Sequence, residues 1–206
     1  MDAQSLAFPL SFDVDYPDRE LNRWTTAFRV ILAIPVLIVL ALLAGGPAGV
    51  HIAIIGASLL LFVPTLLLIL FRQKYPRWWF DFALGLLRFD ARVTSYLFLL
   101  RDEYPSVDED QAVHVDVPYP DVTHDLNRWL PPVKWFLAIP HYVVLIFLNL
   151  AAFVVAIVAW FAILFTGRYP RGLFDFVVGV LRWQIRVAAY AFLLTTDRYP
   201  PFSLNP

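Results

Sequence analysis

Two stretches of the sequence repeat one pattern of charged residues at the spacing of a single helical face. In each stretch an aspartate is followed seven and eleven positions later by an arginine, so all three side chains project from one side of a helix. At a membrane surface such a face binds anionic lipid headgroups, and it also suits an acidic loop of a partner. The structural alternative is an Asp–Arg pair that fixes the helix to the membrane surface or to the other copy. The candidate residues are Asp81, Arg88, Arg92, Asp175, Arg182 and Arg186.

Residues with the spacing of an enzyme centre do not occur in the sequence. Cysteine is absent, and the four histidines lack the spacing of metal ligands. The sequence also lacks a glycine-rich phosphate loop, a nucleophile elbow and a pair of catalytic carboxylates. We therefore expect no catalytic residue, metal or cofactor, and an enzyme acting on lipids would need a constellation that is not there. The formal net charge of −1 lacks the basic excess that binds nucleic acid.

The composition is typical of an integral membrane protein. Hydrophobic residues make up 60% of the 206 residues and charged residues 16%. Soluble domains average about 45–50% apolar and about 25% charged residues. A soluble chain of this composition would lack the polar side chains to cover its surface.

The sequence contains an internal repeat. The segment 21–24 (Leu-Asn-Arg-Trp) recurs 105 residues later, and 15 of the 26 positions from Tyr75 to Leu100 match those 94 residues later. Unrelated apolar helices do not share the positions of Asp, Arg, Gly and Pro. We therefore predict two tandem repeats, residues 1–105 and 106–206.

Each repeat is predicted to contain a transmembrane hairpin of two apolar helices. The expected spans are residues 24–44, 51–71, 131–148 and 151–166. In the first repeat the Gly/Pro cluster 45–49 is a turn signal, and each span reaches about 31 Å at about 1.5 Å per residue. In the second repeat Asn149 is the expected turn, and one long tilted helix is the alternative.

A third helix, residues 78–100 and 172–194, carries the Asp–Arg–Arg pattern in each repeat. A spanning helix would place two arginines near its middle, at about 2.5–3.5 kcal/mol each, and would turn Arg168 and Arg171 outward. An amphipathic helix in the cytoplasmic interface avoids both penalties. We therefore favour the interfacial position over a third span.

The distribution of basic residues predicts the topology. All 16 Lys and Arg lie at or beyond one end of the predicted hairpins, so the positive-inside rule places both termini in the cytoplasm. Trp24 and Trp129 fit an aromatic belt, and the long stems of Arg29 and Lys134 can snorkel to the same interface. These four residues are the expected interfacial anchors. The extended lead-ins, 10–14 and 113–117, can pair as short strands.

One motif is specific enough to indicate a family. It comprises the segment 165–176 (FTGRYPRGLFDF) with Gly179, Arg182 and Arg186, and the closing segment 199–204. This pattern resembles the bacterial multi-pass membrane family known as a domain of unknown function, DUF4389, and the whole chain resembles a tandem pair of it. The resemblance implies a location in the bacterial inner membrane and implies no activity.

Together these features predict an all-α integral membrane protein that acts by assembly and not by catalysis. It would be an accessory subunit of a membrane complex or a self-associating, homo-oligomeric scaffold. The expected partners are the lipid bilayer, anionic lipids, further copies and the subunits of such a complex. The alternative is a small channel or transporter for a lipid or apolar solute, with Arg29, Lys134 and the two Asp–Arg–Arg faces around its cytoplasmic mouth.

Overall fold

The computed structural model describes residues 8–43, 62–107 and 109–206. In this part of the chain the protein is mostly helical and has one two-stranded sheet. In chain order the elements are β1 (Ser11–Val14), α1 (Arg23–Ala27), α2 (Arg29–Leu43), η2 (Leu68–Arg72), α4 (Arg77–Leu97), β2 (Val113–Asp116), α5 (Pro131–Leu137), α6 (Ile139–Thr166), α7 (Arg171–Ala188) and η3 (Ala189–Leu193).

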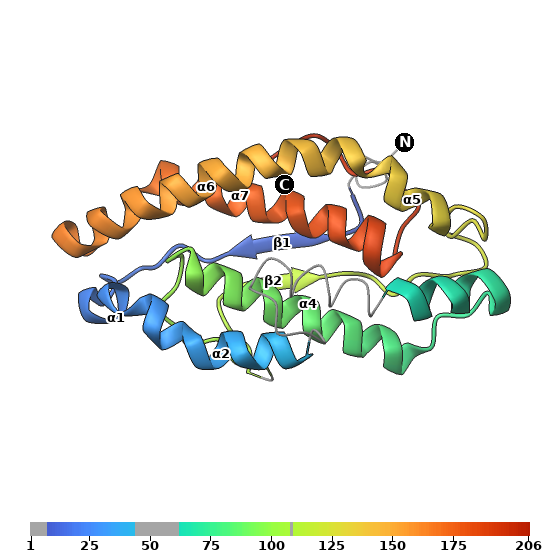
Figure 1. Cartoon of the computed structure of the whole chain (residues 1–206), viewed down its shortest axis with the longest axis horizontal. Coiled ribbons are helices and arrows are strands. Elements are labelled where there is room, and N and C mark those ends of the chain that lie inside the picture. The colour runs from blue at the N-terminus through green and yellow to red at the C-terminus, as the bar shows by residue number, and fades with distance from the viewer. Residues whose placement is uncertain (1–7, 44–61, 108) are drawn as a thin grey trace.

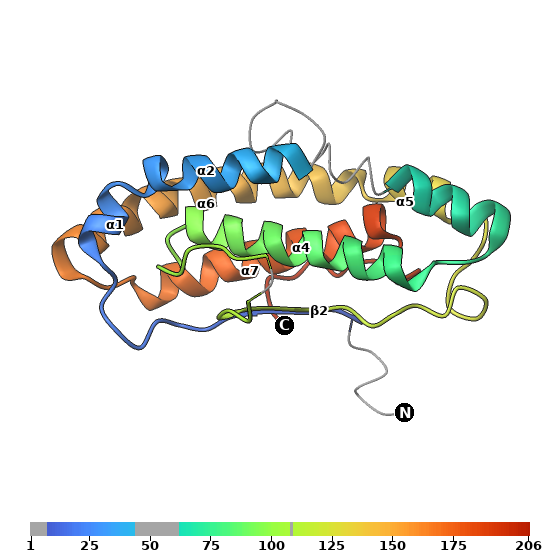
Figure 2. The same cartoon turned by 90° about the horizontal axis from the view of Figure 1, so that it is seen from below.

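The elements form three layers that run parallel to the long axis of the molecule (Figure 2). The apolar helices α2 and α6 form one outer layer, α4 and α7 the middle layer, and the β1–β2 ribbon the opposite outer layer. Across the molecule the order is α6, α7, β1, β2, α4 and α2 (Figure 1). The middle layer therefore separates the apolar helices from the ribbon.

The two lead-in segments pair as the sequence predicts. β1 and β2 are antiparallel, with Phe12 opposite Val115, and each strand buries alternate residues. β1 packs on α7 and β2 packs on α4, so each strand lies on a helix from the other half of the chain. Because a two-stranded ribbon is only marginally stable alone, its buried face is stabilised by these helices.

The predicted hairpin in the second half of the chain is wrong. Residues 139–166 form one continuous helix, α6, and Asn149 lies inside it. Asn is only a moderately poor helix former, and no Gly or Pro follows it to form a turn. The chain breaks earlier, at Ala138, where α5 ends and α6 begins with Pro140 in its first turn. The alternative of one long helix is confirmed.

The amphipathic helices lie in the interior of the protein and not at its surface. Two stretches, Ile139–Thr166 and Arg171–Leu193, are long and apolar enough to cross a membrane. Of the most apolar 18 residues in each stretch, 17% are buried in the first and 78% in the second. The second, α7 with η3, is therefore mostly covered by other parts of the chain, and its arginines meet protein segments. α4 takes the corresponding place in the first half, over Arg77–Leu97.

The first half of the chain agrees in part with its predicted spans. The span 24–44 corresponds to α1 and α2, which are separated at Phe28. Of the span 51–71, the structure describes a helical stretch from Phe62 through η2 to Arg72. The predicted turn at 45–49 lies outside the described residues.

Candidate functional site

The first arginine of each Asp–Arg–Arg pattern contacts the ribbon. Arg88 Nε donates to the Val115 carbonyl at 3.0 Å, and Arg182 Nε donates to the Phe12 carbonyl at 2.9 Å. Phe12 and Val115 are opposite each other, so the two outward carbonyls of one residue pair each accept an arginine. Each arginine thus fixes a strand from the other half of the chain.

The second arginine of each pattern holds an irregular segment against its helix. Arg92 Nη1 donates to the Ser106 carbonyl at 2.8 Å, and Arg186 Nη2 donates to the Asn205 carbonyl at 2.8 Å. Both arginines are buried, with 8% and 3% of their surfaces exposed. Because a buried charge is costly unless it is hydrogen-bonded, these contacts account for both positions.

The two aspartates of the patterns lie apart from the arginines. Asp81 and Asp175 are exposed near the N-terminal ends of α4 and α7, and neither makes an ion pair with an arginine of its own helix. The only carboxylate paired with these arginines among the described residues is that of Asp13, 3.2 Å from Arg182. The spacing therefore correctly placed the three residues of each pattern on one helical face. The aspartates and arginines of that face do not contact one another.

The predicted snorkelling of Arg29 and Lys134 is wrong, because both side chains are buried in ion pairs. Arg29 lies 2.5 Å from Asp102 and Lys134 lies 2.7 Å from Asp197, with 2% and 0% of the two cations exposed. Each cation is also near a tyrosine ring of the middle-layer helices. The carboxylates come from the segments that follow α4 and η3. They pair with the cations inside the protein, where solvent has almost no contact with either cation.

The same two carboxylates also hold the starts of the apolar segments. Asp102 accepts from the Asn22 N–H at 2.7 Å, and Asp197 accepts from the Asn127 N–H at 2.6 Å. The Asn22 side chain accepts from the Trp24 N–H and caps α1, and the Asn127 side chain accepts from the Trp129 N–H in the turn before α5. Both tryptophans are exposed, at 77% and 71%. Exposed rings at opposite ends of the molecule suit the predicted anchoring role.

Sequence reasoning missed Asp102 and Asp197. The signal was present, because both aspartates stand two residues before a Tyr-Pro pair, at 104–105 and 199–200. Their partners lie far away in the sequence, and the structure is needed to identify them. A short motif that occurs in both halves of the sequence is the available clue.

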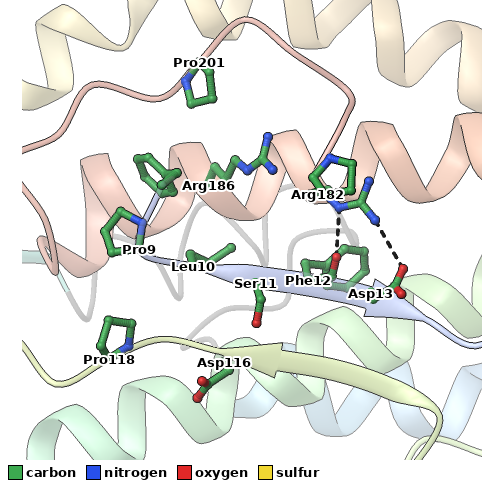
Figure 3. Close-up of a pocket in the computed structure, with 12 residues that line it drawn as sticks. Pro9, Leu10, Ser11, Phe12, Asp13, Asp116, Pro118, Arg182, Arg186 and Pro201 are labelled. Atoms are coloured by element: carbon green, nitrogen blue, oxygen red, sulfur yellow. Dashed lines mark hydrogen bonds and ion pairs between the residues drawn. The ribbon is translucent and has the colours of Figure 1, made fainter. Parts of the chain in front are cut away.

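A cavity of about 670 Å³ lies between β1, α7 and the C-terminal segment (Figure 3). Arg182 and Arg186 line it together with Leu10 and Pro201. Arg182 also donates to the Leu204 carbonyl at 3.1 Å, so backbone carbonyls and Asp13 accept hydrogen bonds from the two guanidinium groups here. Among the described residues no group of three or more His, Cys, Asp or Glu could hold a metal ion. The cavity wall is thus built from contacts that hold the ribbon and the C-terminal segment.

Comparison with known proteins identifies one family. Residues 132–203 match the sequence model of a domain of unknown function, DUF4389, which confirms the predicted resemblance for this part of the chain. The match covers α5, α6, α7 and η3 and less than half of the chain. No curated protein and no solved structure matches the chain significantly.

Proposed function

We propose that this protein, which carries the DUF4389 domain over residues 132–203, is a non-enzymatic membrane protein that acts by assembly. It would serve as an accessory subunit of a membrane complex or as a self-associating scaffold. The observation that carries the proposal is the apolar outer surface of α2 and α6. We call this surface the α2–α6 face. Its exposed residues are Val30, Ile31, Ile34, Ile38 and Leu42 on α2, and Ile146, Phe147, Leu150, Phe153, Val154, Ile157, Val158, Phe161 and Phe165 on α6.

The size of the α2–α6 face supports a membrane location. Soluble monomers rarely expose a contiguous apolar patch larger than about 300–600 Å². Here α2 and α6 lie at opposite edges of the molecule (Figure 1), and each exposes aliphatic and aromatic side chains along its length, from Val30 to Leu42 and from Ile139 to Phe165. Such a surface requires lipid or protein to cover it.

The buried charges support a structural role for the polar residues. Arg29, Lys134, Arg182 and Arg186 donate to carboxylates or backbone carbonyls of the same chain. These contacts hold the four side chains within the fold. The alternative of a channel or transporter receives less support, because Arg29 and Lys134 lie in separate ion pairs and do not surround a common opening.

We also propose that the chain is a tandem duplication in which the halves have exchanged strands. This proposal is supported by contacts that recur at matching positions. Tyr16 donates to the Tyr169 carbonyl at 2.6 Å, and Tyr119 donates to the Tyr75 carbonyl. The Arg88 and Arg182 contacts with the opposite strands match in the same way. The exchange would make the two halves one inseparable unit.

The proposed location is the bacterial inner membrane, with both termini on the cytoplasmic side. The ribbon face would lie in water, because it exposes the charged residues Asp13, Asp15 and Asp116. The described C-terminus, Pro206, lies on the same side of the molecule (Figure 2). The predicted multi-pass topology depends on hairpins, and α6 provides none in the second half.

The test is the composition and native mass of the particle extracted from its own membrane in nanodiscs. Stoichiometric foreign subunits would identify an accessory protein, and a homogeneous oligomer of this chain would identify a scaffold. A monomer without any protein partner would overturn the proposal of assembly. Alkaline carbonate extraction is the control for membrane integration, because a peripheral or soluble protein is released by it.

A further inference from the structure

We infer that α6 lies in the plane of one membrane leaflet, with the α2–α6 face in the acyl chains and the ribbon in the cytoplasm. This inference rests on the proposed membrane function and deepens it by naming the covering partner as lipid. It replaces the expectation that the long apolar helices cross the bilayer. Three independent features of the structure lead to it.

The first feature is the polar ribbon on the face opposite α6. α6 packs along α7, α7 packs on β1, and all three run parallel to the long axis. If α6 crossed the bilayer, the ribbon would lie at the same depth. The exposed carboxylates of Asp13, Asp15 and Asp116 would then face the hydrocarbon. Each acidic group at the centre of a span costs about 2.5–3.5 kcal/mol on insertion scales, so an upright monomer is strongly disfavoured.

The second feature is the presence of basic residues at both ends of the molecule. Arg168 lies beyond the C-terminal end of α6, beside Glu20 at 3.9 Å. Arg128 precedes α5 at the other end and donates to the Leu70 carbonyl. An upright molecule would have cations on both sides of the membrane, against the positive-inside rule. A flat molecule places both groups at one cytoplasmic interface.

The third feature is the position of the two tryptophans that begin the matching segments. Trp24 lies in α1, at the end of the molecule where α6 terminates, and Trp129 precedes α5 at the opposite end (Figure 1). Tryptophan favours the headgroup level of a membrane. When α6 lies flat, both ends of the molecule, and with them both tryptophans, lie at a single interface.

The closest known arrangement in physical terms is the interfacial amphipathic helix, whose apolar face enters about 5–10 Å into the boundary of headgroups and acyl chains. Here the whole molecule is amphipathic in the same sense, with one apolar layer and one polar layer on opposite sides. The apolar layer faces the acyl chains, and the buried arginines of the middle layer lie between it and the ribbon. Lipid therefore covers the apolar surface without bringing a charged residue of the ribbon into the hydrocarbon.

The chain has no cysteine, so single cysteines can report its orientation without a further background change. We would place one at each end of the molecule, Lys74→Cys and Arg168→Cys, and a third on the ribbon, Ser11→Cys. Intact protein in right-side-out and inverted membrane vesicles would be treated with an impermeant maleimide. We expect all three to be labelled in inverted vesicles, with loss of labelling in right-side-out vesicles. Labelling of Lys74→Cys and Arg168→Cys from opposite sides would overturn the inference.

A second reporter identifies what covers the α2–α6 face. Leu150→Cys carries a fluorophore at the middle of α6, where 62% of the native side chain is exposed. Brominated lipids in the vesicles should quench its fluorescence and should leave the fluorophore at Ser11→Cys unquenched. Protection of Leu150→Cys from maleimide without quenching would mean that a second copy covers the face, and lipid would be excluded. Release of the protein by alkaline carbonate would contradict the proposed membrane function itself, which separates that failure from a wrong orientation.

Discussion

Lys134 is fully buried, and its side-chain nitrogen lies 2.7 Å from the Asp197 carboxylate. It also donates to the Thr196 carbonyl at 2.7 Å. Burial lowers the pKa of Lys134, and the hydrogen bond and charge of Asp197 oppose that shift. The pair ties α5, at the start of the apolar segment, to the turn after η3, and therefore fixes the outer layer to the middle layer.

Removing the charge of Asp197 should destabilise the protein strongly. In Asp197→Asn the Lys134 ammonium stays buried without a counter-charge, and breaking a buried pair in this way costs about 3–5 kcal/mol. The free energy of unfolding, measured by denaturant titration in detergent micelles, should fall by this amount. The matched control is Asp175→Asn, an exposed residue on α7. Equal stabilities of the two variants would refute the structural role of the pair.

Several local features could be predicted from the sequence because their causes are local. Asn is a favoured N-cap, and Asn22 caps α1 by accepting from the N–H groups of Trp24 and Thr25. Alternation of apolar and polar residues predicted the strands that pair Phe12 with Val115. In both cases the pattern extends over only a few residues and does not depend on the rest of the fold.

Other features could not be predicted because they depend on which element packs against a given helix face in the folded protein. The periodicity of Arg182 and Arg186 is the same whether the polar face meets water, lipid headgroups or a protein strand. In the structure it meets β1 and the C-terminal segment. Lys134 and its carboxylate are likewise distant in sequence, so only the tertiary fold brings them together. At Asn149 the sequence predicted a turn that does not form. The apolar residues around it continue the helix, and a single Asn does not end it.

Arg182 should be less tolerant of replacement by lysine than Arg88. Arg182 donates to the Phe12 carbonyl, the Leu204 carbonyl and Asp13, whereas Arg88 donates to the Val115 carbonyl. A lysine cannot reproduce the planar fork, and each buried acceptor left without a donor costs about 1–3 kcal/mol. Arg182→Lys should therefore lower the free energy of unfolding by at least about 1 kcal/mol more than Arg88→Lys does.

Hydrogen exchange provides a local check on the arginine pair. In Arg182→Lys the amides of β1 should exchange faster than in the wild type, because the strand loses its contacts with α7. Arg88→Lys is the matched control on the other strand. Equal exchange of β1 in the two variants would contradict a strand-specific role for Arg182.

The carboxyl group of Glu103 should make stability sensitive to acid. Burial tends to raise the pKa of Glu103, but hydrogen bonds from Arg101 and from the Ala112 N–H outweigh it, so the pKa lies below 4.5. A carboxyl whose pKa is lowered by folding stabilises the protein above its unfolded pKa, and the contribution is lost as the pH falls through the folded value. Carbon-13 NMR of the Glu103 carboxyl should give a titration midpoint below 4.5.

The control for the acid prediction is Glu103→Gln, which keeps the shape of the side chain. This variant should be less stable than the wild type at neutral pH, and the difference should shrink as the pH falls below 4.5. A stability difference that does not change with pH would show that the carboxylate charge makes no contribution.

Gly179 and Gly85 occupy matching positions on α7 and α4, but their surroundings differ. A Cβ at Gly179 would lie 2.9 Å from Leu204 Cβ and 3.0 Å from the Leu204 carbonyl oxygen, whereas a Cβ at Gly85 would meet nothing within 4 Å. Ala is favoured over Gly inside a helix by about 0.8–1.0 kcal/mol. We therefore expect Gly85→Ala to raise the free energy of unfolding by up to about 1 kcal/mol. Gly179→Ala should gain nothing, because its methyl group displaces the backbone at Leu204.

The displacement caused by Gly179→Ala should be measurable at the C-terminal segment itself. Arg182 and Arg186 hold this segment through the carbonyls of Leu204 and Asn205. Moving the segment away from α7 lengthens both contacts, so hydrogen exchange at Leu204 and Asn205 should accelerate in Gly179→Ala and stay unchanged in Gly85→Ala. If both variants gained stability and neither changed the exchange of this segment, close packing of Leu204 on Gly179 would not be a feature of the protein in solution.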